Sequence, residues 1–241
     1  MSGLVNYERD GGISRIVFDD GKANVMSIAM LKALHEAFDQ AEKDKTIVLL
    51  SSRGKHFSAG FDLNVFAKGT PEDNHTLLRS GAELALRIFS FPMPVITACH
   101  GNAFPMGAFL ILASDYRIAA EGSYRIGLNE VAIGITPPRF AVELARQRLT
   151  PACLNRTAIL GEMFEPAEAC AAGFFDRIVP AADLQRTVAD AAEVIGKINF
   201  ACHALAKSRT RGAAIKLIQT VIDEDITMDY ANKRVSEREP A

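Results

Sequence analysis

The stretch Gly54-Lys-His-Phe-Ser-Ala-Gly-Phe-Asp-Leu63 contains a predicted turn of small residues. The segment directly before it, Thr46–Ser51 (TIVLLS), is short and apolar, which is typical of a buried strand. The run Ser58-Ala59-Gly60 lets the backbone approach a ligand closely and leaves N–H groups that can point at it. Turns of this composition also serve as plain strand-to-helix connections, so this segment alone assigns no function.

A second segment, Gly101-Asn-Ala-Phe-Pro105-Met106-Gly107, leads into Pro105–Ser114 (PMGAFLILAS), which is apolar almost all round. That composition predicts a buried helix that begins at the proline. The N–H groups in the first turn of a helix have no intrahelical partner and favour a negative charge. If this turn faces Gly60 and Phe61, two N–H groups would converge on one oxygen atom, as in an oxyanion hole. A buried helix with no such role is the alternative.

The third segment, Ile126-Gly-Leu-Asn129-Glu130-Val-Ala-Ile-Gly134, places a carboxylate within an apolar stretch bounded by glycines. Glutamate is rarely buried without a partner or a purpose. Burial raises the pKa of a carboxyl group and makes it a better base near neutral pH. Glu130 is therefore a candidate base, and a glutamate on a solvated face is the alternative.

The order of the patterns predicts a fold in which strands and helices alternate. Strand-like segments occur at 13–18, 95–99, 115–119 and 124–127, and helical patterns at 27–43 and 75–89. From Arg139 onward the patterns are almost entirely helical, with candidates at 182–198 and 213–234. Strands joined by helices favour right-handed crossovers and mainly parallel pairing. We therefore expect an α/β core over residues 1–180 and a helical C-terminal region over residues 181–241.

The composition argues against several classes of protein. The chain has 241 residues, with 27 lysines and arginines against 29 aspartates and glutamates, so its net charge is −2. A nucleic-acid-binding protein needs a basic surplus, which this composition lacks. No uninterrupted apolar run reaches the length of about 18 residues that a membrane span requires. The five histidines and four cysteines are scattered, so we expect no dedicated metal site.

Together, the three segments resemble those of the crotonase (enoyl-CoA hydratase/isomerase) superfamily. Lys55–Leu63 (KHFSAGFDL) matches the F-[SC]-A-G-x-D-L turn of that family, and Gly101–Asp115 matches its second oxyanion segment with the helix that follows. Asp115-Tyr-Arg-Ile and Ile126–Gly134 are most similar to 3,2-trans-enoyl-CoA isomerases of the mitochondrial type. The resemblance covers about residues 5–200. It implies a crotonase-like spiral of repeated β-β-α turns, followed by a helical trimerisation region.

The resemblance also implies roles for individual residues. The Phe61 and Met106 N–H groups would form an oxyanion hole for the thioester oxygen of an acyl-CoA, and Glu130 would be the catalytic base. The entry for CoA and the acyl group would be lined by Ser58, Ala59, Gly60, Phe61 and Asp62, with Asn129 beside the acyl group. Removal of a C2 proton from a 3-enoyl thioester creates an enolate, which two preorganised N–H donors stabilise. One carboxylate can then return the proton to C4.

One position separates isomerisation from hydration. Hydratases of this family use two glutamates, and the position of the first, three residues after Met106, is Phe109 here. A phenyl ring neither accepts nor donates a proton, and it excludes water. The resemblance therefore implies an isomerase that shifts a 3-enoyl-CoA double bond to give 2-trans-enoyl-CoA, as in fatty acid β-oxidation. A hydratase or another acyl-CoA lyase or hydrolase, and a non-catalytic acyl-CoA-binding protein, are the alternatives.

Further properties follow from the resemblance. Coenzyme A would enter as part of the substrate, with no other cofactor, and the chain would assemble as a homotrimer or a dimer of trimers. Many relatives have glycine in place of Met106, so we expect a narrower pocket. Arg139 puts a cation after the base segment, at a subunit contact or beside a polar substrate. The first residues carry no signal-peptide pattern, which favours the cytoplasm.

Overall fold

The structure, a computed structural model, describes residues 3–230. A six-stranded sheet in the order β1-β2-β3-β5-β7-β10 forms its centre. The strands are β1 (Val5–Asp10), β2 (Ile13–Phe18), β3 (Ile47–Ser52), β5 (Val95–Cys99), β7 (Tyr116–Ala120) and β10 (Arg177–Val179). β1 and β2 are antiparallel, and every other neighbouring pair in this sheet is parallel, as the alternation of strands and helices predicts.

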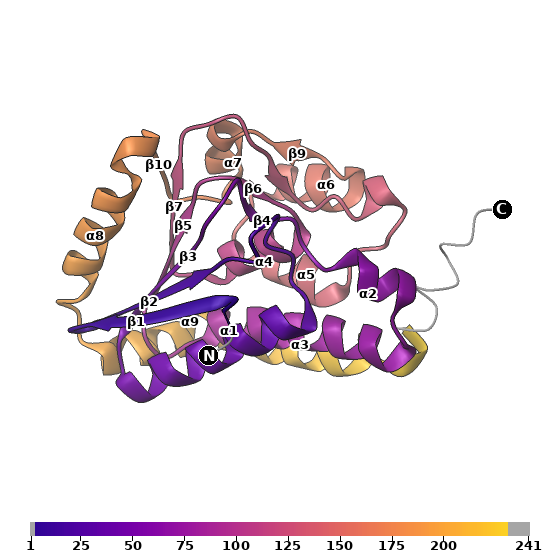
Figure 1. Ribbon diagram of the computed structural model, residues 1–241, viewed down its shortest axis with the longest axis horizontal. Helices are drawn as coiled ribbons and strands as arrows, with labels where there is room; N and C mark the ends of the chain where they lie inside the picture. Colours follow the sequence, from indigo (N-terminus) through magenta and orange to yellow (C-terminus); the bar gives the residue numbers. More distant parts are fainter. Residues whose placement is uncertain (1–2, 231–241) are drawn as a thin grey trace.

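The inner strands of this sheet are buried on both faces, and the side chains of β3 show why. Val48 and Leu50 face the large core, whereas Ile47 and Leu49 face a smaller one. The helices α1 (Ile28–Asp44) and α3 (Pro71–Ser90) lie on the side of the large core, and α8 (Leu184–Ile195) covers the other side (Figure 1). Successive side chains of a strand point to opposite faces, so a strand between two helical layers is apolar at nearly every position.

A second, four-stranded sheet runs in the order β4-β6-β8-β9. Its strands are β4 (His56–Ser58), β6 (Asn102–Ala103), β8 (Ile126–Gly127) and β9 (Met163–Phe164). Each of β3, β5 and β7 in the large sheet is followed by a strand of the small sheet and then by a helical segment. This repeat is the spiral of β-β-α turns that the sequence predicts, and it places the loops after β4, β6 and β8 next to one another.

The remaining helical segments are α2 (Leu63–Lys68), α4 (Pro105–Ala113), α5 (Arg139–Arg146), α6 (Pro151–Leu160), α7 (Pro166–Ala172), α9 (Phe200–Asp225) and the 3₁₀ turns η1 (Val131–Ile133) and η2 (Ala181–Asp183).

Capping residues fix where the helices α1 and α3 begin. Ser27 accepts the Met30 N–H at 3.1 Å, so α1 begins directly after it. α3 begins four residues earlier than the predicted start at His75, because Thr70 and Asp73 form a capping box.

The largest difference between predicted and observed elements is the start of α9, which lies at Phe200 rather than at residue 213. The first half of this helix packs through charges: Lys207 Nζ donates to the Asp115 carboxylate at 2.7 Å, and Arg211 Nη1 lies 2.9 Å from it. A helix face that packs through charged side chains leaves no apolar periodicity in the sequence, so the periodicity does not predict this half of α9. Residues 231–234 of the predicted helix lie outside the described residues. The domain boundary at residue 180 stays a prediction.

Candidate active site

The register of the small sheet brings the three predicted segments together. Ser58 of β4 pairs with Ala103 of β6, and Ala103 pairs with Ile126 of β8. From these aligned positions the chain continues into the turn at residues 59–61, the start of α4 and the segment at residues 127–130. Because parallel strands end at the same edge of a sheet, the three continuations lie side by side, as ligand-binding loops do in other parallel sheets.

The first continuation is a turn that only glycine adopts easily, since Gly60 has a φ of +90°. The turn is anchored to Met26: the Met26 N–H donates to the Gly60 carbonyl at 2.8 Å, and the Asp62 N–H donates to the Met26 carbonyl at 3.2 Å. Successive peptide groups of an extended segment point in opposite directions, so the Phe61 N–H points away from Met26. A Cβ atom on Gly60 would lie 3.9 Å from the Met106 nitrogen, so the turn contacts the start of α4.

The second continuation is the N-terminal end of α4. The Phe104 N–H donates to the Ser58 carbonyl at 3.0 Å, and the helix begins at the next residue. Met106 lies in the first turn, where N–H groups have no intrahelical partner. A Cβ atom on Gly107 would lie 2.8 Å from the Ser58 Cβ, so glycine is needed for this close approach. The Phe61 and Met106 N–H groups therefore lie on two contacting backbone segments, which is the arrangement that an oxyanion hole requires.

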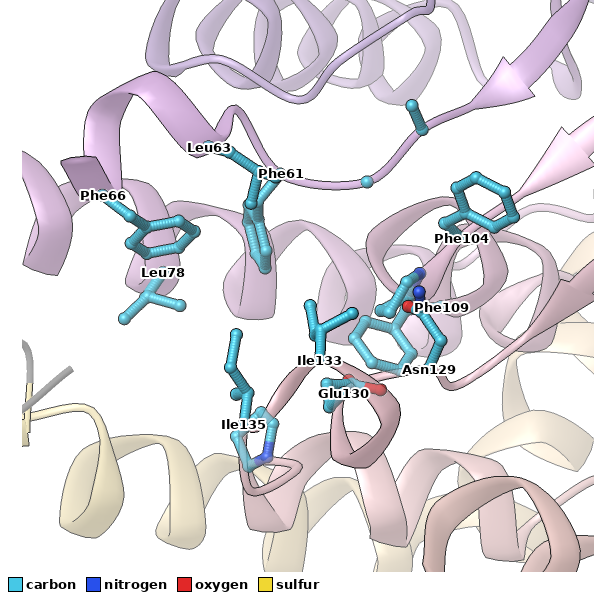
Figure 2. Close-up of a pocket in the computed structure, with 14 residues that line it drawn as sticks. Phe61, Leu63, Phe66, Leu78, Phe104, Phe109, Asn129, Glu130, Ile133 and Ile135 are labelled. Carbon is cyan, nitrogen blue, oxygen red and sulfur yellow. The ribbon is translucent and has the colours of Figure 1, made fainter. Parts of the chain in front are cut away.

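A pocket with a volume of about 190 Å³ opens beside these two segments (Figure 2). Its described lining consists of Ala59, Gly60, Phe61, Leu63, Phe66, Leu78, Phe104, Pro105, Phe109, Asn129, Glu130, Ile133, Ile135 and Pro138. Within this lining, Asn129 and Glu130 carry the only polar side chains. Such a pocket suits a largely apolar ligand that is oriented by a few polar contacts.

The third continuation supplies both polar side chains. Glu130 directly precedes η1 and is 5% exposed, so of the two alternatives that the sequence leaves open, a buried and a solvated glutamate, the structure shows the buried one. The Ile135 N–H donates to the Glu130 carbonyl at 2.8 Å, which closes the turn around η1 and holds the backbone of the glutamate. The buried side-chain oxygen of Asn129 accepts no hydrogen bond within residues 3–230. A short, constrained loop thus directs a carboxylate and a carboxamide at the pocket.

Phe109 lies one turn along α4 from Met106, and its ring lines the pocket near Glu130 (Figure 2). The ring packs edge-on against Phe140 of α5, with 5.5 Å between the ring centroids and an angle of 71° between the planes. Contacts of this geometry stabilise aromatic pairs beyond their buried area. A phenyl ring packed against a second ring therefore lines the pocket that also contains Glu130.

The Met106 side chain does not belong to the described lining of the pocket, so it does not narrow the pocket by direct contact. It is fully buried and lies toward α3, where its Sδ atom would be 3.2 Å from a Cβ atom on Gly81. The same glycine makes room for the Phe61 ring, because a Cβ atom there would lie 2.5 Å from the Phe61 Cε1. The side chain that enters the pocket is therefore that of Phe61 and not that of Met106.

Two of the five predicted turn residues support the turn from behind. The Ser58 hydroxyl donates to the Asn24 carbonyl at 2.7 Å and accepts the Gly60 N–H at 3.2 Å. The Asp62 carboxylate accepts the Asn64 N–H at 2.9 Å and caps α2. The other three turn residues line the pocket. Contacts of all five with CoA stay a prediction.

The sequence gives no sign of the pocket walls that lie away from Glu130. Those walls come from α2, α3 and the loop before α5, through Phe66, Leu78, Ile135 and Pro138. The burial of Leu78 is predictable from the apolar stripe of its helix, but nothing in the sequence indicates that this stripe lines a site. Arg139, for which two roles were open, pairs with Glu224 at 2.8 Å and with Asp225 at 3.0 Å.

In residues 3–230, no group of three or more histidine, cysteine, aspartate or glutamate side chains could hold a metal ion. None of the helices within the same range is long and apolar enough to cross a membrane. The polar groups at the pocket are thus one carboxylate, one carboxamide and the backbone N–H groups of the two contacting segments.

Known proteins are similar to this chain in sequence and in fold. The sequence profile of the enoyl-CoA hydratase/isomerase family matches residues 8–239. The chain belongs to the enoyl-CoA hydratase/isomerase family. A crystal structure of a member from Pseudomonas syringae superposes with a TM-score of 0.90 at 39% identity, covering 92% of this chain and 96% of the other. The predicted crotonase fold is confirmed.

Curated relatives bear the names of different reactions. Human "Enoyl-CoA delta isomerase 1, mitochondrial" is 29% identical over 227 residues, which cover 92% of this chain and 75% of the relative. Carnitinyl-CoA dehydratase of Salmonella enteritidis is 32% identical over 197 residues, which cover 80% of this chain and 74% of the relative. The first curated relatives are matched over 50% to 75% of their own length. The choice among reactions therefore depends on the pocket.

Proposed function

We propose that this protein is an enoyl-CoA isomerase that converts 3-enoyl-CoA into 2-trans-enoyl-CoA. The observation that carries the proposal is the presence of Glu130 and Phe109 in one pocket. Glu130 is the single carboxylate in the described lining, and Phe109 lines the same pocket. By the family resemblance, Phe109 occupies the position of the glutamate that hydratases use as their second acid–base group. Isomerisation needs one base, whereas hydration also needs a group that delivers water.

The reaction takes place between Glu130 and two backbone N–H groups. The Glu130 carboxylate takes a proton from C2, and the electron pair of the broken C–H bond spreads over the dienolate, with negative charge on the thioester oxygen. The Phe61 and Met106 N–H groups donate to that oxygen and lower the energy of the dienolate. The Glu130 carboxyl group then gives the proton to C4, a C2=C3 double bond forms, and the carboxylate is regenerated.

The apolar walls of the pocket support both partners in this reaction. Exclusion of water strengthens the electrostatic interaction between N–H donors and an oxyanion. A carboxylate among apolar groups is a stronger base than one in water. The edge-on contact between Phe109 and Phe140 fills the space next to Glu130 with carbon. A C2 proton of the substrate is therefore the natural partner of the carboxylate.

The substrate is a thioester, and its coenzyme A is part of the substrate rather than a separate cofactor. Substrate and product are isomers, so no electron acceptor or donor is consumed. The acyl chain extends from the oxyanion hole along the apolar side chains of Phe61, Phe66 and Leu78. Asn129 lies beside the acyl group with its side-chain oxygen directed at buried space.

A homotrimer, or a dimer of trimers, in the cytoplasm completes the proposal. Large apolar side chains are exposed on α6, α8 and α9, where Leu160 is 70%, Val194 65% and Leu205 60% exposed. Contact with further copies would remove such surface from water. Analytical ultracentrifugation is expected to give three or six times the chain mass of 26.1 kDa, and a monomer would contradict this assembly.

Hydration is the alternative that the names of some relatives favour. To decide between the reactions, purified protein is incubated with 3-enoyl-CoA and, separately, with 2-trans-enoyl-CoA in water. We expect conversion of the first and little 3-hydroxyacyl-CoA from the second. Efficient hydration would contradict the one-base mechanism. Binding of acyl-CoA without turnover of either compound would support the non-catalytic alternative instead.

A further inference from the structure

Three consecutive acidic residues, Asp223, Glu224 and Asp225, end the longest helix of the described chain, α9. The C-terminal end of a helix carries a partial negative charge, so acidic side chains there are unfavourable unless cations offset them. Each of the three is within ion-pair distance of an arginine from another helix. We call these three residues the acidic run.

The arginines reach the acidic run from two different helices. Arg79 of α3 donates to Asp223 at 2.6 Å, and this hydrogen bond lowers the pKa of Asp223. Arg139, the first residue of α5, pairs with Glu224 at 2.8 Å and with Asp225 at 3.0 Å. The acidic run therefore connects the C-terminal end of α9 to α3 and to α5 at the same time.

A further contact strengthens the link between α9 and α3. The ring nitrogen Nε2 of His75, one turn before Arg79, lies 3.1 Å from the Ile226 carbonyl, directly after the acidic run. Val221, Ile222 and Ile226 are buried in the same large core as the pocket walls. The helix end is thus fixed by apolar packing as well as by charge, and Figure 1 shows α9 alongside α3.

Both arginines follow a pocket residue directly in the sequence. Leu78 precedes Arg79 and lines the pocket from α3, and Pro138 precedes Arg139 and lines it from the start of α5. The ion pairs therefore connect the end of α9 to the two chain segments that carry these pocket walls. The acidic run itself lies outside the described pocket lining.

We propose that the acidic run is a clamp that sets the separation of the Leu78 and Pro138 walls and so determines which acyl chains the pocket accepts. This inference rests on the proposed acyl-CoA substrate. In the intact clamp the two walls hold a fixed gap that suits a short chain. Without the clamp the walls separate more readily, so longer and bulkier chains fit, and short chains lose contacts.

The test uses the full-length protein and the triple variant Asp223→Asn, Glu224→Gln, Asp225→Asn. The matched control is Glu193→Gln, which removes an exposed ion pair with Lys197 (3.1 Å) on α8, away from the pocket. Steady-state kinetics are measured with 3-enoyl-CoA of increasing chain length. For the triple variant we expect KM for the shortest chain to rise about threefold to tenfold, with kcat within about twofold of wild type. An unchanged chain-length profile, or the same change in Glu193→Gln, would overturn the clamp.

Binding of saturated acyl-CoA, measured by calorimetry, separates the clamp from the isomerase proposal, because binding needs no turnover. A shift in chain-length preference of the triple variant supports the clamp even if wild type fails to isomerise 3-enoyl-CoA. A wild-type protein that binds acyl-CoA with a preference equal to that of the triple variant refutes the clamp alone. Failure of wild type to bind acyl-CoA of any length refutes both proposals.

The salt dependence of the chain-length preference is a second measurement. A purely structural role of the acidic run would leave that preference unchanged. The side chains of Arg79, Asp223, Arg139 and Glu224 are 32%, 54%, 56% and 55% exposed, so salt screens their attraction. We expect the ratio of affinities for short and long acyl-CoA to fall toward that of the triple variant at about 1 M salt. The ratio cancels the common effect of salt on the CoA moiety. A wild-type ratio that does not change with salt would contradict the clamp.

Discussion

The two ends of α4 carry opposite partial charges. Their surroundings differ: one end borders a pocket, and the other is bonded by an arginine. At the N-terminal end, the Met106 N–H and the neighbouring Phe61 N–H lie beside a pocket with apolar walls. At the C-terminal end, Arg148 donates to the Leu112 and Ser114 carbonyls at 3.1 and 2.6 Å. The negative end is thus matched by a resident cation, while the positive end is available to an anion that forms during a reaction.

One carboxylate lies near each end of α4, and the two carboxylates differ in their surroundings as the two helix ends do. Asp115, just past the C-terminal end, accepts the Val95 N–H at 2.9 Å and pairs with Lys207 and Arg211. Burial lowers the pKa of Lys207, and the attraction of Asp115 acts against that shift. Glu130, on the N-terminal side, faces the pocket. Asp115 is thus paired with cations that hold α9 against the core, whereas Glu130 lines the pocket in which we propose that the substrate binds.

Replacement of Glu130 by glutamine tests the N-terminal side and should have the largest effect on activity. A neutral amide cannot take the C2 proton, so we expect kcat with 3-enoyl-CoA to fall by about 10²- to 10⁴-fold. The side chain keeps its shape, so affinity for saturated acyl-CoA and the midpoint of urea unfolding should stay close to wild type. Undiminished turnover would show that the base is another group.

Replacement of Asp115 by asparagine tests the C-terminal side and should affect stability instead. The change leaves Lys207 and Arg211 buried without their counter-ion, so we expect the free energy of unfolding to fall by about 3 to 5 kcal/mol. Urea denaturation measures this loss. Turnover per folded molecule should not change. Lost turnover at unchanged stability would reverse the roles of the two carboxylates.

Replacement of Phe109 tests which reaction the N-terminal side performs, because the proposed function makes the absence of an acid–base group at this position the reason for isomerisation. Phe109→Glu would place a second acid–base group beside Glu130, so we expect the ratio of hydration to isomerisation to rise by about tenfold or more. Phe109→Leu, which adds no such group, is the matched control. The ratio does not depend on the folded fraction of either variant. Equal ratios in the two variants would mean that Phe109 does not separate the reactions.

Asp20 is a third carboxylate for this comparison, and we expect its replacement to have the smallest effect of the four changes. Burial alone would raise its pKa, but N–H groups of Asn24, Val25 and Lys22 donate to the carboxylate and bring the pKa below its usual range. Because the folded-state pKa is the lower one, the stabilisation is complete above about pH 3.9 and is lost as pH falls through the folded-state pKa. Asp20→Asn should cost about 1–2 kcal/mol at pH 7, as judged by urea unfolding. A difference from wild type that persists below that range would contradict this account.

The three site segments could be predicted because each is continuous in sequence and each has an unusual local composition. The turn at Ser58-Ala59-Gly60, the proline that opens α4 and the glutamate among apolar residues are visible without a structure. Their convergence follows from parallel pairing, which the alternation of patterns indicates, and from the β-β-α spiral that the family resemblance implies. The direction of the Met106 side chain could not be predicted, because it depends on Gly81, a residue of a distant helix.

Other features were invisible for physical reasons. β1 reads Val-Asn-Tyr-Glu-Arg-Asp, and only Val5 is buried, because an edge strand with one neighbour turns its polar side chains to solvent. The first half of α9 reads as polar, yet Lys207 and Arg211 are held against Asp115, which is remote in sequence. The pocket walls from α2, α3 and the loop before α5 are plain apolar side chains that gain a function only through their position.

A crystal structure with a bound, unreactive analogue of 3-enoyl-CoA tests the central claim most directly. We predict that the thioester oxygen lies about 2.7–3.1 Å from both the Phe61 and the Met106 nitrogen atoms. The Glu130 carboxylate should lie within about 3.5 Å of C2 and on the same face as C4, with the Phe109 ring excluding water from C3. A thioester oxygen remote from both N–H groups, a second carboxylate at C2, or a water molecule held between Glu130 and C3 would contradict a one-base isomerase.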